Sequence, residues 1–195
     1  YNTLKINKLH LFSGTTIYIT DFLTDQAITF ITDQTQNDPA QPWFMYMSYT
    51  APHAPLQAKP EDLARVPLAD HFADASDNEK RQIYGAMVVN MDDNIGRLLD
   101  LLDTLGIAEN TIVIFHSDNG GPIVGQNWSL NVPLRGKKGE LWEGGICVPF
   151  AVSWPGTIPA GQVFGNNNFI SSLDILPTLA AVSGADEENE IRTDG

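Results

Sequence analysis

Residues 111–121, TIVIFHSDNGG, join an apolar run to a polar turn, and they indicate the class of fold. The first five residues are continuously apolar or β-branched, which is typical of a strand buried on both faces. The run leads into Asp118, Asn119, Gly120 and Gly121, all of them turn-forming residue types. Because ligands in α/β sheets bind beyond the carboxyl ends of strands, this polar turn is a candidate site.

Two further apolar runs predict strands, at residues 43–49 (WFMYMSY) and 148–154 (VPFAVSW). Helices are predicted around them. Thr20 and Asp21 precede apolar residues at spacings of three and four, which predicts that a helix starts there. Residues 173–183 predict a last helix, and Gly184 follows its end.

The longest helix is predicted over residues 79–105, with Gly106 as its C-terminal cap. Its apolar residues recur every three or four positions and so share one face: Ile83, Met87, Met91, Ile95, Leu98 and Leu102. Long helices between apolar strands predict an α/β fold with a largely buried sheet. A second polar cluster, residues 50–55, follows the predicted strand at 43–49.

Composition limits the possible partners. The chain has 195 residues, 43% of them hydrophobic and 18% charged, which is typical of one globular domain. Its formal net charge of -13 disfavours nucleic acid as a partner. The single cysteine cannot form an intrachain disulfide, and no apolar run is long enough to predict a membrane span.

Three segments carry residues suited to chemistry. Asp118 and Asn119 supply the hard oxygen ligands that calcium and magnesium prefer, although a plain turn needs the same residue types. Arg135, Lys137 and Lys138 lie in a glycine-flanked loop that could bind sulfate or phosphate, or could be a solvated basic loop. His53 lies between two prolines and could donate a proton to a leaving group, or could be structural.

Taken in this order, the segments resemble the sulfatase family of the alkaline phosphatase superfamily. The matching segments are residues 18–27 (YITDFLTDQA) with 30–31 (FI), 51–55 (APHAP), 91–96 (MDDNIG), 110–121 (NTIVIFHSDNGG), 131–139 (NVPLRGKKG), 142–146 (WEGGI), 154–156 (WPG) and 174–178 (DILPT). The resemblance implies an alkaline-phosphatase-like sandwich, with a central, mostly parallel sheet flanked by helices. It also implies that residues 1–195 are the C-terminal part of a catalytic domain, incomplete and truncated at both ends.

The resemblance also implies roles for individual residues. It implies that Asp118 and Asn119 are ligands of Ca2+. It implies that Lys138 contacts the sulfate, and that His53 contacts the sulfate ester and assists the leaving oxygen. We therefore expect His53 and Lys138 to be both catalytic and substrate-binding, with Arg135 and Lys137 in supporting roles.

The nucleophile of the family is a formylglycine made from a C/S-x-P-x-R motif, which this sequence lacks and which we expect upstream. Cys147 starts a C-x-P pattern, but Ala151 stands where the motif requires arginine. We therefore expect Cys147 to be a buried, small hydrophobic residue at a strand entrance.

The expected function is arylsulfatase-like hydrolysis of a sulfated small molecule or sugar. Two alternatives stay open: a phosphodiester or phosphonate hydrolase of the same superfamily, and an inactive fragment or pseudoenzyme. The resemblance alone favours a periplasmic, secreted or lysosomal location, and the sequence does not predict an oligomeric state.

Overall fold

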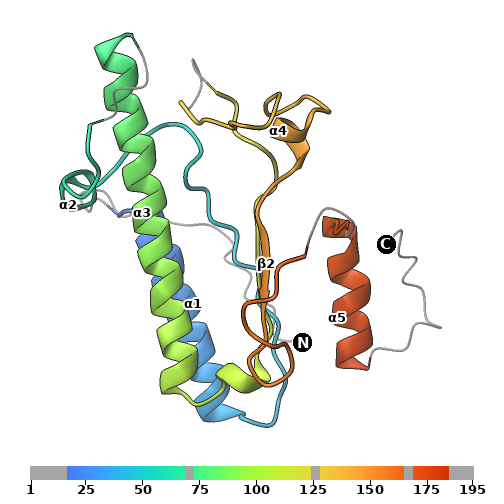
Figure 1. Ribbon diagram of the computed structural model, residues 1–195. Helices are drawn as coiled ribbons and strands as arrows, with labels where there is room; N and C mark the ends of the chain where they lie inside the picture. Colours follow the sequence, from blue (N-terminus) through green and yellow to red (C-terminus); the bar gives the residue numbers. More distant parts are fainter. Residues whose placement is uncertain (1–16, 69–72, 124–127, 165–168, 185–195) are drawn as a thin grey trace. The chain divides into compact units, whose positions relative to one another are not determined.

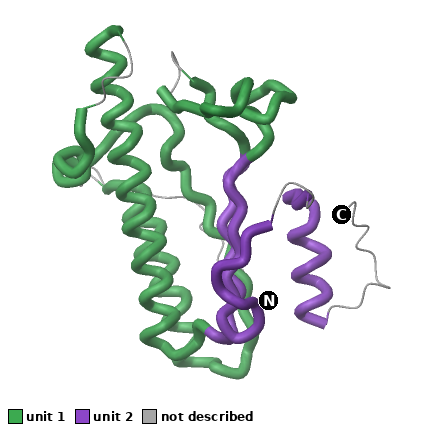
Figure 2. Tube along the Cα trace, in the orientation of Figure 1, with its two compact units in different colours: residues 1–108, 119–147 green, residues 109–118, 148–195 purple. Residues whose placement is uncertain are grey.

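The computed structural model describes residues 17–68, 73–123, 128–164 and 169–184. The chain divides into two compact units, shown in Figure 2. Unit 1 comprises residues 1–108 and 119–147, and unit 2 comprises residues 109–118 and 148–195. None of the described helices is both long and apolar enough to cross a membrane.

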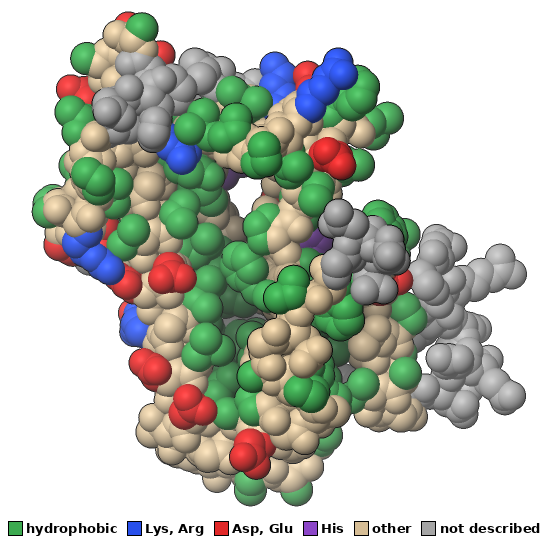
Figure 3. Space-filling model, viewed as in Figure 1, with side chains coloured by type: hydrophobic (Ala, Val, Ile, Leu, Met, Phe, Trp, Pro, Cys, Tyr) green, Lys and Arg blue, Asp and Glu red, His purple; other side chains and the backbone are tan. Residues whose placement is uncertain are grey.

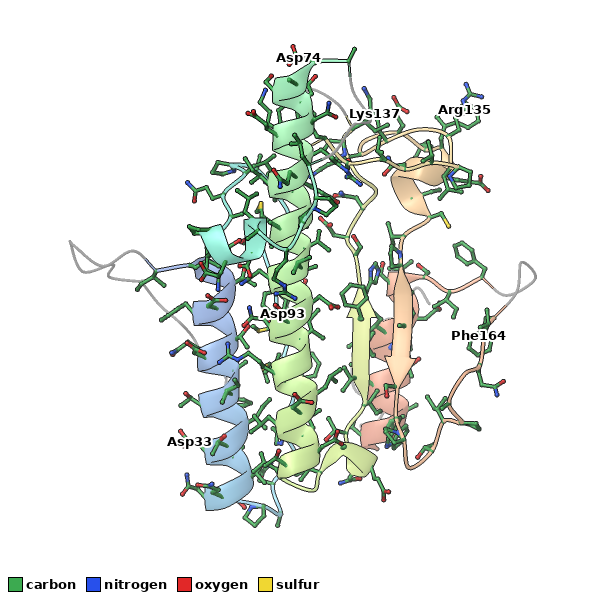
Figure 4. The ribbon with its side chains drawn as sticks, turned by 60° about the vertical axis from the view of Figure 1, so that its left-hand side comes forward. Asp33, Asp74, Asp93, Arg135, Lys137 and Phe164 are labelled. Atoms are coloured by element: carbon green, nitrogen blue, oxygen red, sulfur yellow. The ribbon has the colours of Figure 1, made fainter. Side chains whose placement is uncertain are left out.

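Unit 1 is built on two long helices, α1 (Ile19–Asn37) and α3 (Ala75–Thr104), which lie side by side in Figures 1 and 4. Two one-turn helices accompany them, α2 (Pro60–Leu63) and α4 (Glu143–Ile146). The buried apolar side chains of the described residues all belong to α1 and α3: Ala27, Ile31, Ala86, Met87 and Leu102. Helix packing therefore forms the core of this unit.

The prediction for α3 is confirmed in its apolar face and its end. None of the six predicted apolar side chains is exposed, and Gly106 follows the C-cap with a left-handed φ of 69°. The helix begins at Ala75, before the predicted residue 79. It begins there because the Asp74 carboxylate accepts a hydrogen bond from the Ser76 backbone N–H, 2.7 Å away.

The predicted start of α1 is wrong. The helix begins at Ile19, and Thr20 and Asp21 lie inside its first turn. Asp21 instead accepts hydrogen bonds from Asn90 at 3.0 Å and Asn94 at 2.8 Å, both on α3. The Asp21 side chain, which the sequence pattern predicted to cap α1, is therefore used in hydrogen bonds to another helix.

The predicted strand at residues 43–49 is also wrong, since these residues join no sheet in the described part of the chain. Their side chains nevertheless alternate: Trp43, Met45 and Met47 are half-buried, whereas Phe44 and Tyr46 are 71% and 82% exposed. Such alternation is typical of an extended segment with one covered face. An apolar run can predict an extended chain, but a strand also requires a hydrogen-bonding neighbour.

Unit 2 contains β1 (Val113–His116) and β2 (Phe150–Ser153), followed by α5 (Ile175–Ser183). Short 3-10 turns precede β1 and α5, at η1 (Ala108–Asn110) and η2 (Ser172–Asp174). The strands pair antiparallel, with Val113 opposite Ser153 and His116 opposite Phe150. The predicted mostly parallel sheet is therefore not what the described strands form. Between residues 117 and 149, the described residues (117–123 and 128–149) contain only the one-turn α4 and not the longer crossover helix usual between parallel strands.

Candidate active site

The candidate metal ligands lie at the end of β1. The Ser117 backbone N–H still donates to Pro149 O at 3.3 Å, and the chain then turns into Asp118 and Asn119. Asp118 is exposed, and no ion pair engages its carboxylate within the described residues. Asn119 is half-buried and donates from Nδ2 to Gly120 O at 2.9 Å, which fixes the orientation of its amide. The turn is thus ordered and presents a carboxylate and an amide next to each other.

Asn131 ties this turn to the basic loop. Its Oδ1 accepts from the Gly121 backbone N–H at 3.0 Å. Its Nδ2 donates to Gly121 O at 2.8 Å and to Gly136 O at 3.0 Å. The Lys138 backbone N–H also donates to Gly121 O, at 3.1 Å. The predicted site residues Asn119 and Lys138 are therefore brought together in unit 1, through Gly121.

Glycines allow these segments to approach backbone to backbone. A Cβ at Gly120 would lie 1.8 Å from Gly144 O, and a Cβ at Gly144 would lie 2.3 Å from Gly136 O. Gly136 also has a φ of 96°, which residues with side chains rarely adopt. Within unit 1, three segments therefore form one closely packed group, called here the glycine core (residues 119–121, 135–139 and 143–145).

One segment of the glycine core, residues 135–139, carries three basic side chains. Arg135, Lys137 and Lys138 are all exposed, and Figure 3 shows Lys and Arg atoms gathered on this segment next to α4. Within the described residues none of the three forms an ion pair. By contrast, four other described cations each pair with an aspartate: Lys59 with Asp21, Arg65 with Asp93, Lys80 with Asp77, and Arg97 with Asp25. The loop therefore gathers three cations that form no ion pair among the described residues, although Glu140 lies in the same segment, with its Oε2 3.2 Å from the position of a Cβ at Gly136.

His53 lies in a turn of unit 1 that its own backbone closes, since its N–H donates to Thr50 O at 2.9 Å. Its Nδ1 lies 2.7 Å from Ala54 O. A carbonyl oxygen can only accept, so Nδ1 carries a proton and Nε2 is the nitrogen that can exchange one with a ligand. The side chain is exposed. The expected positioning of His53 is thus supported by two local hydrogen bonds.

The side chains of Asp118 and Asn119 are of the type that binds a hard cation, but two residues are too few to complete its coordination. Asp118 and Asn119 offer oxygen atoms, as Ca2+ prefers, but Ca2+ takes six to eight ligands. Among the described residues, no group of three or more His, Cys, Asp or Glu side chains is placed to hold a metal ion. These two residues could therefore form only part of a calcium site.

The prediction of a buried Cys147 is wrong, because the side chain is exposed. Cys147 is the C-cap of α4, and its N–H donates to Glu143 O at 2.7 Å. The regular strand begins only at Phe150, so Cys147 lies outside the sheet that was expected to cover it.

Sequence reasoning missed two residues of this region. Asn131 was treated only as part of a matched segment, because a single Asn in a loop predicts no particular partner. Trp142 was likewise not singled out, yet the Arg135 guanidinium carbon lies 3.7 Å from its ring centroid. An arginine and a tryptophan seven positions apart give no local signal, since only the fold of the loop brings them together.

Comparison with known proteins identifies the family of this chain. The family model named Sulfatase matches residues 5–185. A sulfatase of Formosa agariphila is 34% identical over 190 residues, covering 92% of this chain and 32% of that protein. N-acetylgalactosamine-6-sulfatase of Mus musculus is 33% identical over 179 residues, covering 91% of this chain and 31% of that enzyme. This chain belongs to the sulfatase family.

A solved structure gives the same result for the fold. The crystal structure of Ps i-CgsB in complex with k-i-k-neocarrahexaose superimposes with a TM-score of 0.79 at 38% identity. The match covers 90% of this chain and 36% of that one. It supports the expected alkaline-phosphatase-like α/β class, of which the described residues supply helices and a two-stranded sheet. The chain spans about a third of the length of the curated relatives it matches.

Proposed function

We propose that this protein hydrolyses sulfate esters, with Lys138 holding the sulfate and His53 serving the leaving group. The observation that carries the proposal is the ordered basic loop, whose three exposed cations form no ion pair among the described residues. In a chain with 24 acidic and 11 basic residues, three exposed cations gathered in one loop are suited to binding the oxygens of an external anion.

Lys138 is suited to this role by its backbone. Its N–H bond to Gly121 O fixes its Cα beside the DNGG turn, while its side chain remains exposed to a ligand. An ammonium group held near the ester can stabilise the negative charge that grows on the sulfate oxygens as the bond breaks.

His53 would act on the alcohol side of the ester. With Nδ1 directed at Ala54 O, protonated Nε2 can donate its proton to the departing oxygen. The loss of a free alkoxide is unfavourable near neutral pH, so this proton transfer lowers the barrier to cleavage.

Calcium belongs to the proposal as a partner of Asp118 and Asn119. The ion would supply positive charge at the sulfate oxygens when bound. The formylglycine that the family resemblance implies has no matching motif in these residues, so the chain's own contribution is binding, charge and proton transfer.

The substrate class follows from the relatives. One relative is named for a sulfated amino sugar, and the solved neighbour was crystallised with an oligosaccharide. We therefore propose a sulfated sugar in preference to a small aryl ester. A phosphodiester or phosphonate remains the chemical alternative, because phosphate and sulfate oxygens attract the same basic side chains.

The test is the turnover of Lys138→Ala and His53→Ala in the active protein. Each change should lower kcat/KM for a sulfate ester by a factor of about 10² or more, the usual contribution of one stabilising or proton-transferring group. Val132→Ala, an exposed change in the same loop, is the control and should leave the rate unaltered. Near-normal rates in both site variants, or faster cleavage of an aryl phosphate than of the matching aryl sulfate, would overturn the proposal.

A further inference from the structure

We propose that Arg135, Lys137 and Trp142 form a second subsite, beside Lys138, that binds a neighbouring sulfated unit of a short oligosaccharide. The inference rests on the proposed function, since it extends the sugar beyond the reacting ester. It assigns a task to two cations and an indole ring that the reaction itself does not use.

The stack of Arg135 on Trp142 is the first support. With the guanidinium carbon 3.7 Å from the ring centroid, the indole covers one face of the guanidinium group. Stacking leaves the N–H edge of that group open, and this edge is the part that pairs with two oxygens of a sulfate. Trp142 itself is 50% exposed, so part of the indole remains available to the apolar face of a sugar ring.

The second support is that the stack stands on an ordered backbone. Arg135 O accepts from the Gly144 N–H, and Trp142 O accepts from the Gly145 N–H, both at 2.7 Å. Between them, a Cβ at Gly136 would lie 2.5 Å from the Cβ of Trp142, so only glycine permits this approach. Because Arg135 and Trp142 are already held in place, binding of a ligand costs little free energy for ordering them.

Charge is the third support. Figure 4 shows Arg135 and Lys137 projecting outward from the loop next to α4. Both are exposed and without an ion pair in the described part of the chain. A single sulfate held by Lys138 leaves Arg135 and Lys137 available, and a second sulfate on the neighbouring sugar unit would pair with them.

The net charge limits the length of the ligand. At -13 the whole chain repels a long polyanion, but this repulsion is screened beyond about 8 Å at physiological salt. A short oligosaccharide with two sulfates therefore gains the local contacts at little long-range cost. The same reasoning disfavours nucleic acid, although its bases could also stack on an indole.

The experiment uses the active protein and two probes, a galactose disaccharide with one sulfate and the same disaccharide with two. The measured quantity is the ratio of kcat/KM for the doubly over the singly sulfated probe. Arg135→Gln should lower this ratio about tenfold, mainly through KM, because one charge-assisted contact is lost. Arg135→Lys, which keeps the charge but loses the planar fork, should give an intermediate ratio.

Leu141→Ala is the matched control, since Leu141 lies in the same segment and is 91% exposed. The ratio should not change in this variant. An unchanged ratio in Arg135→Gln, or an equal fall in Leu141→Ala, would overturn the subsite.

Failure of the proposed function is distinguished by binding. If the protein cleaves neither probe, Trp142 fluorescence still reports the subsite, measured as the difference between the protein and Trp142→Phe. Saturable quenching by the doubly sulfated probe that disappears in Arg135→Gln would support the subsite without sulfatase activity. Equal responses to both probes, or no response, would overturn it.

Discussion

Gly120 is the residue at which the candidate site is most sensitive to a single methyl group. The Cβ of an alanine there would lie 1.8 Å from Gly144 O, a backbone atom that cannot move without displacing α4. Gly96, in α3, offers the opposite environment, because nothing lies within 4 Å of its added Cβ. The two positions separate the effect of close approach from the general effect of replacing glycine.

We predict that Gly120→Ala lowers the free energy of unfolding by about 2 kcal/mol or more, the cost of overpacking a fixed contact. Gly96→Ala should raise it by about 1 kcal/mol, because alanine favours a helix interior over glycine. Urea unfolding of both variants, compared through the transition midpoint, measures the difference. A wild-type midpoint for Gly120→Ala would show that the glycine core tolerates a side chain.

At the scale of elements, a polar clasp (Asp21, Lys59, Asp62, Asn90 and Asn94) joins α1, α2 and α3. Asn90 donates to Asp21 and to Asp62, each at 3.0 Å, and Lys59 donates to Asp21 at 2.9 Å. Asn90 and Asn94 are each only 2% exposed, so their amides must be paired to be buried at all. The clasp therefore determines the relative position of α1, α2 and α3 more specifically than apolar packing alone would.

Acid should weaken this clasp. Burial raises the pKa of Asp21, but the hydrogen bonds from Lys59, Asn94 and Asn90 outweigh burial, so the pKa lies below the ordinary 3.8. A lowered pKa means that the carboxylate stabilises the fold fully above its ordinary pKa, and that this contribution is lost as the pH falls through the lower value of the folded state.

We predict that Asp21→Asn costs about 2 kcal/mol of unfolding free energy near neutral pH, as expected for charge-assisted hydrogen bonds. The difference from wild type should shrink as the pH falls below the ordinary pKa of 3.8 and through the lower pKa of Asp21 in the folded state. Asp33→Asn is the control on the same helix, since Asp33 is exposed and is labelled on the outer side of α1 in Figure 4. Thermal unfolding at several pH values measures both, and a difference that is constant with pH would contradict the assignment.

The sequence predicted those elements that depend on local pattern. The apolar face of α3 and the glycine ends of α3 and α5 follow from spacing and from the left-handed conformation that glycine accepts. The start of α1 and the pairing of residues 43–49 could not be predicted, because each depends on a partner distant in the chain. For the site, ordered motifs predicted Asn119 and Lys138, while the connecting role of Asn131 required the fold.

At the scale of the whole molecule, two opposing surface properties decide how these residues behave in solution. Large apolar side chains are exposed at several places, among them Phe44, Tyr46, Leu141, Val163 and Phe169. Neither described strand has a second neighbour, so β1 and β2 each leave an unpaired edge in the described sheet. Such surface favours association, whereas a net charge of -13 opposes it by mutual repulsion.

We therefore predict that residues 1–195, produced alone, associate in a salt-dependent manner. At about 10 mM salt the Debye length is about 30 Å and the chains repel one another, whereas at about 150 mM it falls to about 8 Å and the apolar surfaces can meet. Light scattering across this range should show a rising mass. The double variant Phe44→Ser with Tyr46→Ser should rise less, because it removes two apolar side chains from the exposed face of residues 43–49 while the charge stays the same. A monomer that melts sharply at both salt concentrations would show that this apolar surface is covered within the chain itself.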